Sequence, residues 1–357
     1  MLNPDQHYNP KIFDKDVELG LIRKGFGEGL LAAGEADRNV VGLCADLTES
    51  TQMLLFKQKF PERFVEIGVA EQNLATVASG MAAMGKIPFI TSYAMFSPGR
   101  NWEQIRTTIC YNDRPVKIIG SHAGVSVGPD GGTHQAIEDL AIMRVIPRMV
   151  VISPCDAVEA RKATIAAAKT KDPTYIRLCR EKTAIMTTED TPFEIGKASI
   201  IYKAKSRPEG DQRIGSTESR AGGGSKEKGN INTKTDVGII ATGPLLHKAL
   251  LAAKKLEAEG GSVIVMNLST IKPLDEQAII RLAHDTSGIV TVEEHQIHGG
   301  MGSAVAECLA SQYPTHIEFV GVRDQFGQSG TMSELIEHYG MGEKDIYHAA
   351  QRVILRK

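Results

Sequence analysis

The sequence lacks several features that would point to particular classes of protein. No apolar run reaches about 18 residues, so we expect no membrane-spanning helix. The first 16 residues are polar and acidic, unlike a signal or transit peptide. Lys and Arg number 41 against 43 Asp and Glu, which leaves no basic excess for nucleic acid or an anionic membrane. We therefore predict a cytoplasmic protein that binds neither.

Cysteines and aromatic residues are also scarce. The five cysteines lie far apart, with no CxxC pair and no histidine at metal-ligand spacing, so we predict buried free thiols and no metal site. Phe, Trp and Tyr make up only 5% of the chain. A local concentration of aromatic side chains is therefore informative here.

The length and the periodicity predict two α/β domains. The chain has 357 residues, of which 42% are hydrophobic, and predicted strands alternate with predicted helices almost throughout. That alternation favours doubly wound, mostly parallel sheets. We place the first domain at 1–195 and the second at 236–357. Between them, 196–235 holds a strand and an insertion at 204–234, rich in Gly, Ser and Lys, which we expect to be flexible.

Glu71 is the first candidate functional residue. Residues 64–67 predict a short buried strand, and a helix rich in small side chains follows. Glu71 lies in the first turn of that helix, where a carboxylate can simply complement the helix dipole. Asp46 is a similar case. The predicted strand of about six residues that starts at residue 39 ends at Asp46, and the polar residues 48–50 follow. Polar residues at that position line ligand crevices, although Asp46 can equally be a helix N-cap.

A loop and a neighbouring segment carry further candidates. Tyr93, Phe96 and Trp102 surround a Pro-Gly turn after a predicted strand, and we expect them to face a ligand rather than the core. The glycine-rich segment 120–134 then contains His122, Asp130 and His134. We expect the preceding strand to end at His122 and the next helix to begin at His134. Arg177 and Arg180 lie at the end of another predicted strand.

Two glycine-rich segments superficially resemble phosphate loops. The glycines at 25, 27 and 29 are preceded by no predicted strand, so they fail the structural context that such a loop requires. Gly299, Gly300 and Gly302 precede a predicted helix and can serve either phosphate binding or close helix packing.

Four segments together resemble the C-terminal half of the transketolase family. They are VEIGVAEQN, ADLTES, SHAGVSVGPDGGTHQAIED and GVRDQFGQSG, and the resemblance covers nearly the whole chain apart from the insertion. In that family, this half comprises a pyrimidine-binding domain and a C-terminal domain. The Gly-Asp-Gly…Asn motif that holds Mg²⁺ and the cofactor diphosphate lies in an N-terminal domain, which this sequence does not contain. The resemblance therefore implies a split transketolase (EC 2.2.1.1, pentose phosphate pathway) with a separate N-terminal subunit, in an α2β2 heterotetramer.

The resemblance also implies residue roles, with thiamine diphosphate as cofactor and sugar phosphates as substrates. Glu71 matches the acid at N1′ of the aminopyrimidine ring, where it shares a proton with the ring and activates the cofactor for attack on a ketose carbonyl. Phe96 and Tyr93 match residues that stack on the ring, whereas the third family aromatic has no clear match. The remaining matches are His134 near the 4′-amino group, Asp46 and Leu47 near the thiazolium, and a substrate set of Arg23, Ser50, His122, Asp130 and Arg180.

Three alternatives stay open on sequence alone. A 2-oxoacid dehydrogenase beta subunit has the same two-domain plan, but its substrate needs no sugar-phosphate site. A deoxyxylulose-phosphate synthase shares the DG-x-THQ loop but is normally one full-length chain. A non-catalytic subunit that has kept the fold is the third alternative, and the presence of Glu71, His122 and His134 disfavours it.

Overall fold

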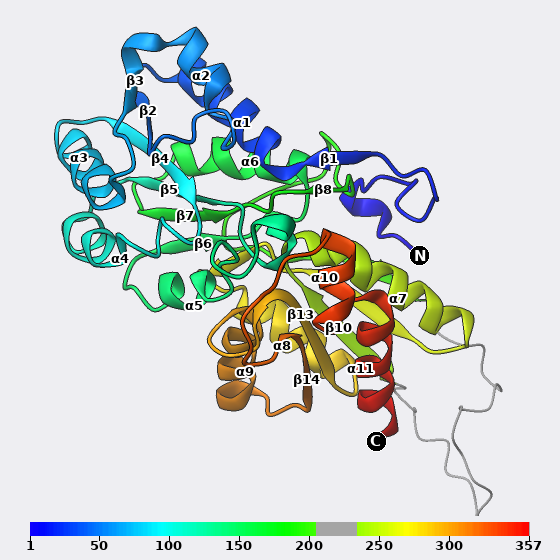
Figure 1. The fold of residues 1–357 in the computed structure, drawn as a ribbon. Coiled ribbons are helices and arrows are strands. Elements are labelled where there is room, and N and C mark those ends of the chain that lie inside the picture. The colour runs from blue at the N-terminus through cyan, green and yellow to red at the C-terminus, as the bar shows by residue number, and fades with distance from the viewer. Residues whose placement is uncertain (205–233, 357) are drawn as a thin grey trace, which may run out of the picture.

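The computed structural model describes residues 1–204 and 234–356 and confirms two α/β domains, one above the other in Figure 1. The predicted insertion falls almost entirely outside the described residues. The domain boundaries predicted from sequence stay predictions, because residues 2–12 also contact the second domain through Leu2, Tyr8 and Ile12. None of the helices in the described ranges is long and apolar enough to cross a bilayer.

The first domain is built on a seven-stranded sheet of order β12-β6-β7-β5-β4-β2-β3. All neighbouring strands are parallel except β12, which the second domain contributes at the sheet edge as an antiparallel strand. The strands are β2 (Val40–Cys44), β3 (Phe64–Glu66), β4 (Ile87–Tyr93), β5 (Lys117–Ser121), β6 (Val150–Ile152), β7 (Thr174–Arg177) and β12 (Thr270–Lys272).

Helices cover both faces of this sheet, as expected for a doubly wound fold (Figure 1). One face packs against α1 (Ile22–Ala36), α2 (Leu54–Lys59) and α6 (Ala157–Ala168). The other packs against α3 (Glu71–Ala83), α5 (Asp139–Arg144) and α4 (Trp102–Gln104), which continues as a π-helix at Ile105–Cys110. Short 3-10 helices lie at Pro4–Gln6, Pro61–Arg63, Val125–Asp130 and Gly243–Leu245.

The second domain has a five-stranded sheet of order β14-β13-β10-β11-β9, parallel except for β9. Its strands are β9 (Ser199–Lys203), β10 (Val237–Ala241), β11 (Val263–Asn267), β13 (Ile289–Gln296) and β14 (Ile317–Val322). Its helices are α7 (Leu246–Ala258), α8 (Glu276–Asp285), α9 (Met301–Gln312), α10 (Met332–His338) and α11 (Glu343–Leu355). Buried apolar residues of both domains form shared clusters, so the domains are packed together by a continuous core.

Residues 17–34 have apolar residues at helical spacing, but the helix covers only part of this segment. The chain first forms a short strand, β1 (Leu19–Leu21), antiparallel to β8 (Lys182–Ala184), and α1 starts only at Ile22. The glycines that follow are helical and allow close packing. A Cβ at Gly25 would lie 1.9 Å from the Ala157 carbonyl oxygen, and one at Gly29 would lie 2.7 Å from that of Arg161, both on α6. Their role is therefore the contact of α1 with α6, not phosphate binding.

The five cysteines are all buried and free, as predicted. The expectation that His134 begins a helix is wrong, because α5 begins only at Asp139. His134 instead lies in a turn, with its N–H donating to the Gly131 carbonyl.

Candidate active site

The predicted site residues follow the carboxyl ends of adjacent parallel strands. In the sheet order β7-β5-β4-β2-β3, Arg180 follows β7, His122 follows β5, and Tyr93 ends β4. Asp46 follows β2, and Glu71 follows β3. Parallel strands bring these residues to one edge of the sheet. The chain reverses its direction of winding between β2 and β4, which is where ligands bind in open α/β sheets.

Glu71 is the first residue of α3 and only 4% exposed. The side-chain amide of Asn101 donates to its carbonyl oxygen (2.9 Å) and fixes the start of the helix. Its carboxylate accepts hydrogen bonds from Nη1 of Arg100, at 3.3 Å to Oε1 and 3.2 Å to Oε2. Arg100 was not predicted as a site residue. Its place directly after the Pro98-Gly99 turn, in the same loop as Tyr93 and Phe96 (the aromatic loop, 93–102), could have indicated it.

Four rings lie together, and one of them, Phe96, contacts the Arg100 guanidinium that pairs with Glu71. Tyr93 stacks on His122 with 4.0 Å between ring centroids, and lies 6.3 Å from Phe96 in a nearly parallel orientation. His134 meets the Phe96 ring edge-on at 5.3 Å. Trp102, also expected to face a ligand, turns away: its indole N–H donates to the Ile142 carbonyl (2.7 Å), and it packs against the core. The loop thus brings together Tyr93 and Phe96 but not Trp102.

His122 occupies an unusual environment. It is buried and has a φ of 55°, which non-glycine residues uncommonly adopt. Burial lowers its pKa to about 3, and the positive charges of Arg23 and Arg180 contribute to the shift. Its Nδ1 lies 2.9 Å from Ser121 Oγ. The ring is therefore neutral near pH 7 and contributes hydrogen bonding rather than charge.

The two arginines near His122 are held in place by backbone carbonyls. Arg23 donates to the carbonyl oxygens of Arg180 (3.1 Å) and Ser50 (3.0 Å). Arg180 donates to the Val127 carbonyl (2.7 Å) and to Asp130 Oδ1 (3.2 Å). Burial, and secondly the charge of Arg180, lowers the pKa of Arg23. Two guanidinium groups held close enough to repel each other suit an anionic ligand.

Glu66 at the end of β3 organises the neighbouring loop, a role that the sequence analysis missed. Its Oε1 accepts the backbone N–H groups of Asp46 (2.7 Å) and Gly68 (3.2 Å), and its Oε2 accepts the Thr48 hydroxyl (3.0 Å). The parallel pairing of Cys44 with Glu66 places this carboxylate beside the end of β2. The sequence alone does not show this contact, because it depends on the pairing of β2 with β3 and on their register.

Asp46 is not a helix N-cap, so that alternative is wrong. It is exposed with a φ of 58°, and the next α-helix, α2, starts at Leu54 with Met53 at its N-cap. Leu47 is half-buried and packs against the core cluster of α1, α2 and α6.

Contacts from the second domain fix the position of segment 122–134 of the first domain, which we call the histidine loop. Glu294 of β13 accepts the backbone N–H of Ser126 through Oε1 (2.7 Å). The Gln135 side chain donates to the carbonyl oxygens of Val125 and Gln328, each at 3.0 Å. The loop that carries Asp130 and His134 is therefore fixed by contacts across the domain junction.

Arg177 has a structural role at the same junction. Its Nε donates to the Asp139 carboxylate (2.9 Å to Oδ2), and its Nη2 donates to the Glu294 carbonyl oxygen (2.7 Å). The Tyr175 hydroxyl donates to Asp139 Oδ2 (2.7 Å). Both charged side chains of this pair are only 2% exposed, so the network faces no ligand.

The glycines before α9 also have an internal partner. The carboxylate of Glu293 accepts the backbone N–H groups of Met301 (2.6 Å) and Gly302 (2.8 Å). A Cβ at Gly300 would lie 2.2 Å from Glu293 Oε2. The first turn of this helix thus already binds an anionic group of the protein, which favours packing over phosphate binding.

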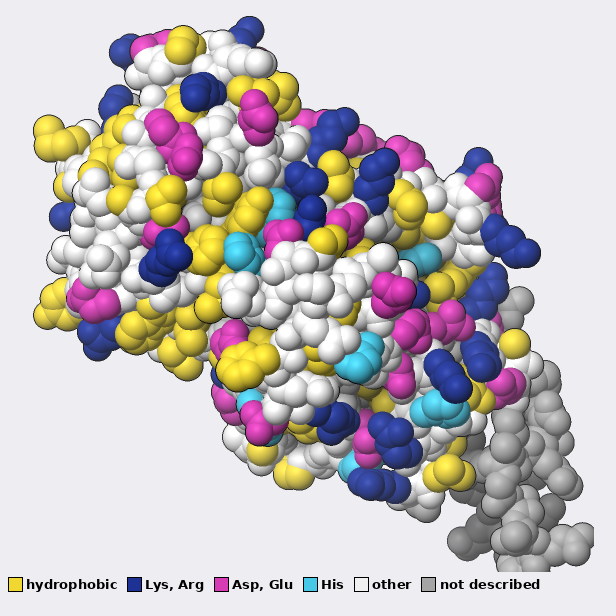
Figure 2. All heavy atoms as spheres, viewed as in Figure 1, with side chains coloured by type: hydrophobic (Ala, Val, Ile, Leu, Met, Phe, Trp, Pro, Cys, Tyr) yellow, Lys and Arg dark blue, Asp and Glu magenta, His cyan; other side chains and the backbone are white. Residues whose placement is uncertain are grey.

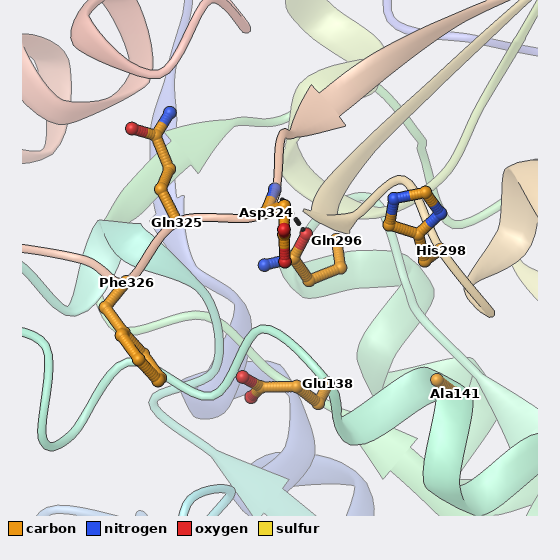
Figure 3. A pocket seen from close by; sticks show the side chains of 7 residues that line it. All are labelled: Glu138, Ala141, Gln296, His298, Asp324, Gln325 and Phe326. Atoms are coloured by element: carbon orange, nitrogen blue, oxygen red, sulfur yellow. Dashed lines mark hydrogen bonds between the residues drawn. The ribbon is translucent and has the colours of Figure 1, made fainter.

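A pocket of 310 Å³ lies between the domains and contains none of the predicted site residues (Figure 3). It is lined by Glu138, Ala141, Gln296, His298 and residues 324–326. On the face drawn in Figure 2, histidine side chains lie beside Lys or Arg and acidic side chains near the same junction. Within residues 1–204 and 234–356, no group of three or more His, Cys, Asp or Glu is arranged to hold a metal ion.

Comparison with known proteins adds two domain matches. Residues 21–185 match the transketolase pyrimidine binding domain, and residues 228–346 match the transketolase C-terminal domain. The chain is 40% identical over 328 residues to a "Putative transketolase C-terminal section" of Methanocaldococcus jannaschii, covering 91% of this chain and 93% of that protein. It is 37% identical over 345 residues to a "6-deoxy-6-sulfo-D-fructose transketolase subunit" of Clostridium sp., covering 97% and 98%.

A solved structure supports the same relationship. The chain resembles one described as "Split gene transketolase, inactive beta4 tetramer", with a TM-score of 0.80 and 39% identity, over 94% of this chain and 98% of that one.

Proposed function

The chain belongs to the transketolase family as a C-terminal subunit of the split type, and on this premise we propose that it carries the pyrimidine half of a thiamine diphosphate site. With an N-terminal partner that holds the diphosphate and Mg²⁺, it transfers a two-carbon ketol unit from a ketose phosphate to an aldose phosphate. The observation that carries this proposal is the buried Glu71 carboxylate, which Arg100 links to the Phe96 ring and, through it, to the ring group of Tyr93.

The residues at the sheet edge fit the aminopyrimidine ring of this cofactor. Phe96 offers a flat ring for stacking, and Glu71 offers an acid that can hold a proton at N1′. His134, in contact with Phe96, is suited to donate or accept a hydrogen bond at the ring's amino group or at the substrate. When bound, thiamine diphosphate supplies a nucleophilic carbon for addition to a ketose carbonyl.

The cationic group of Arg23 and Arg180, with Asp130 beside it, fits the far end of a sugar phosphate. Arg23 and Arg180 carry the positive charge, His122 offers a neutral ring for a hydroxyl, and Asp130 accepts from a second hydroxyl or orients Arg180. Ser50 is held next to Arg23 through its carbonyl oxygen. Asp46 and Leu47, in the loop fixed by Glu66, are proposed to lie near the thiazolium ring.

A second donor class deserves comparison, because the Clostridium relative is named for a sulfonated fructose. A sulfonate has the shape of a phosphate and one negative charge less at neutral pH. The same two arginines can therefore hold either group, and a phosphate dianion uses their charge more fully.

We further propose an α2β2 assembly in the cytoplasm that acts in the pentose phosphate pathway (EC 2.2.1.1). The solved split transketolase described as an inactive tetramer of beta subunits is consistent with a C-terminal subunit that self-associates but needs its partner for turnover.

The substrate class is tested with Arg180→Ala in the complex with the N-terminal subunit. Loss of a charged hydrogen bond to a bound dianion costs about 1.5 to 3 kcal/mol, so KM for xylulose 5-phosphate should rise roughly ten- to hundredfold. Turnover of hydroxypyruvate, which carries no phosphate, should change little. Arg148→Ala, at an exposed arginine paired with Asp113, is the matched control.

Equal damage to both donors would show that Arg180 is structural and that phosphate binds elsewhere. A larger effect on a 6-sulfonated ketose than on xylulose 5-phosphate would favour the sulfonated donor.

A further inference from the structure

Arg100 contacts both Glu71 and Phe96, the two residues proposed to bind the aminopyrimidine ring. Its guanidinium donates from Nη1 to both oxygens of the Glu71 carboxylate, and its Cζ lies 4.4 Å from the centroid of the Phe96 ring. Within the described part of the chain, Arg100 is the only hydrogen-bond partner of the Glu71 side chain. One planar cation thus contacts both the acid and the stacking ring of the proposed site.

A guanidinium and a protonated aminopyrimidine present similar chemistry to these partners. Both are flat, both carry a delocalised positive charge, and both offer N–H donors in the plane to a carboxylate. Both also favour the face of an aromatic ring. Arg100 can therefore satisfy the buried Glu71 carboxylate when the cofactor is absent.

The exposure of the two partners distinguishes this pair from a structural one. The Arg100 side chain is 52% exposed while that of Glu71 is 5% exposed, whereas Arg177 and Asp139 at the domain junction are 2% exposed on both sides. In a structural ion pair of the interior, both charges are buried and hydrogen-bonded, because an uncompensated buried charge is costly. Arg100 keeps a path to solvent.

The backbone around the pair is fixed, so only the Arg100 side chain needs to move. The Arg100 N–H donates to the Phe96 carbonyl (2.9 Å), and Asn101 holds the Glu71 carbonyl. Rotation of one exposed side chain exposes the Glu71 carboxylate and the adjacent Phe96 ring together.

We propose that Arg100 is a placeholder for the cofactor: it pairs with Glu71 and covers Phe96 in the empty subunit, and it swings out when the aminopyrimidine ring enters. The inference rests on the proposed function, because it takes Glu71 and Phe96 as cofactor contacts. Its consequence is competition, in which the empty site is closed by its own side chain. Apparent cofactor affinity is then reduced by the fraction of molecules with the site open.

The test compares cofactor affinity with stability for Arg100→Ala. In the complex with the N-terminal subunit, calorimetric titration with thiamine diphosphate and Mg²⁺ should give about three- to tenfold tighter binding than wild type, which corresponds to an open fraction of roughly a tenth to a third. The isolated Arg100→Ala chain should melt at a lower temperature than wild type, because Glu71 is left buried without a partner. A merely structural arginine would lower both stability and affinity, so the opposite signs identify a placeholder.

Two controls sharpen the result. Arg106→Ala removes an exposed arginine six residues along the chain and should change neither quantity. In a Glu71→Gln background, Arg100→Ala should change cofactor affinity less than twofold, because the ion pair is already gone.

Each remaining outcome decides against the placeholder, and the second also decides against the proposed function. Unchanged or weaker binding by Arg100→Ala, with wild type binding the cofactor, overturns the placeholder and leaves the proposed function standing. No binding of thiamine diphosphate by the wild-type complex overturns the proposed function and the placeholder with it.

Discussion

The domain junction and the strand-end site each contain an arginine that faces a carboxylate, but the two pairs differ in their surroundings. At the junction, Arg177 also binds a carbonyl of the second domain, and Asp139 also accepts from Tyr175, so both charges are buried with several partners. At the site, Glu71 depends on one half-exposed arginine. Both partners of the junction pair are buried, whereas one partner of the site pair is half-exposed.

This difference fits the proposal that the subunit folds alone and needs a partner for activity. The junction ties the histidine loop to the second domain through Glu294 and Gln135, so the residues proposed to bind the sugar phosphate are fixed within one chain. No group of three or more His, Cys, Asp or Glu in residues 1–204 or 234–356 is arranged to hold a metal ion. We propose that the diphosphate half of the site lies on another chain.

The largest expected effect is on catalysis at the strand-end site. Glu71→Gln, assayed in the complex with the N-terminal subunit, should lower kcat by about 10²- to 10⁴-fold, because an amide cannot exchange a proton with the cofactor ring. Exchange of the cofactor C2 proton, followed by NMR, should slow in parallel. Glu103→Gln on the nearby exposed surface is the matched control. Wild-type exchange in the Glu71→Gln complex would exclude Glu71 as the activating acid.

A smaller effect, on stability alone, is expected at the domain junction. Arg177→Met leaves the Asp139 carboxylate buried without its cation and should lower the free energy of unfolding by about 3 to 5 kcal/mol. Urea unfolding of the isolated chain measures it, with Arg177→Lys as a milder variant that keeps the charge. Arg148→Met in an exposed pair should cost less than about 1 kcal/mol. Equal losses for Arg177→Met and Arg148→Met would show that the buried junction pair contributes no more to stability than an exposed pair.

The sequence predicted the residues at the strand ends better than the contacts between them. Strand-helix alternation predicted a parallel sheet, and a parallel sheet places Asp46, Glu71, Tyr93, His122 and Arg180 at one edge. Glu66 and Glu294 escaped notice because they act through register and domain packing. Glu66 meets the residues after β2 only because β2 and β3 are neighbours, and Glu294 reaches Ser126 from 168 residues away.

Local patterns also failed where tertiary packing decides. Trp102 lies in the same aromatic loop as Tyr93 and Phe96, but its indole N–H has an acceptor at Ile142, so it turns to the core. The glycines of α1 resembled a phosphate loop, yet they serve the close approach of α6. In both cases the deciding partner lies on a different element, more than 35 positions away in the sequence.

We propose that this chain holds one half of a site that a second chain completes. The most direct test measures thiamine diphosphate binding and ketol transfer by the purified chain alone, and then with the N-terminal subunit added. We expect weak cofactor binding and no turnover for the chain alone, with both restored in the mixture, because Mg²⁺ and the diphosphate lack their anchor in the isolated chain. Micromolar cofactor affinity together with turnover by this chain alone would contradict it.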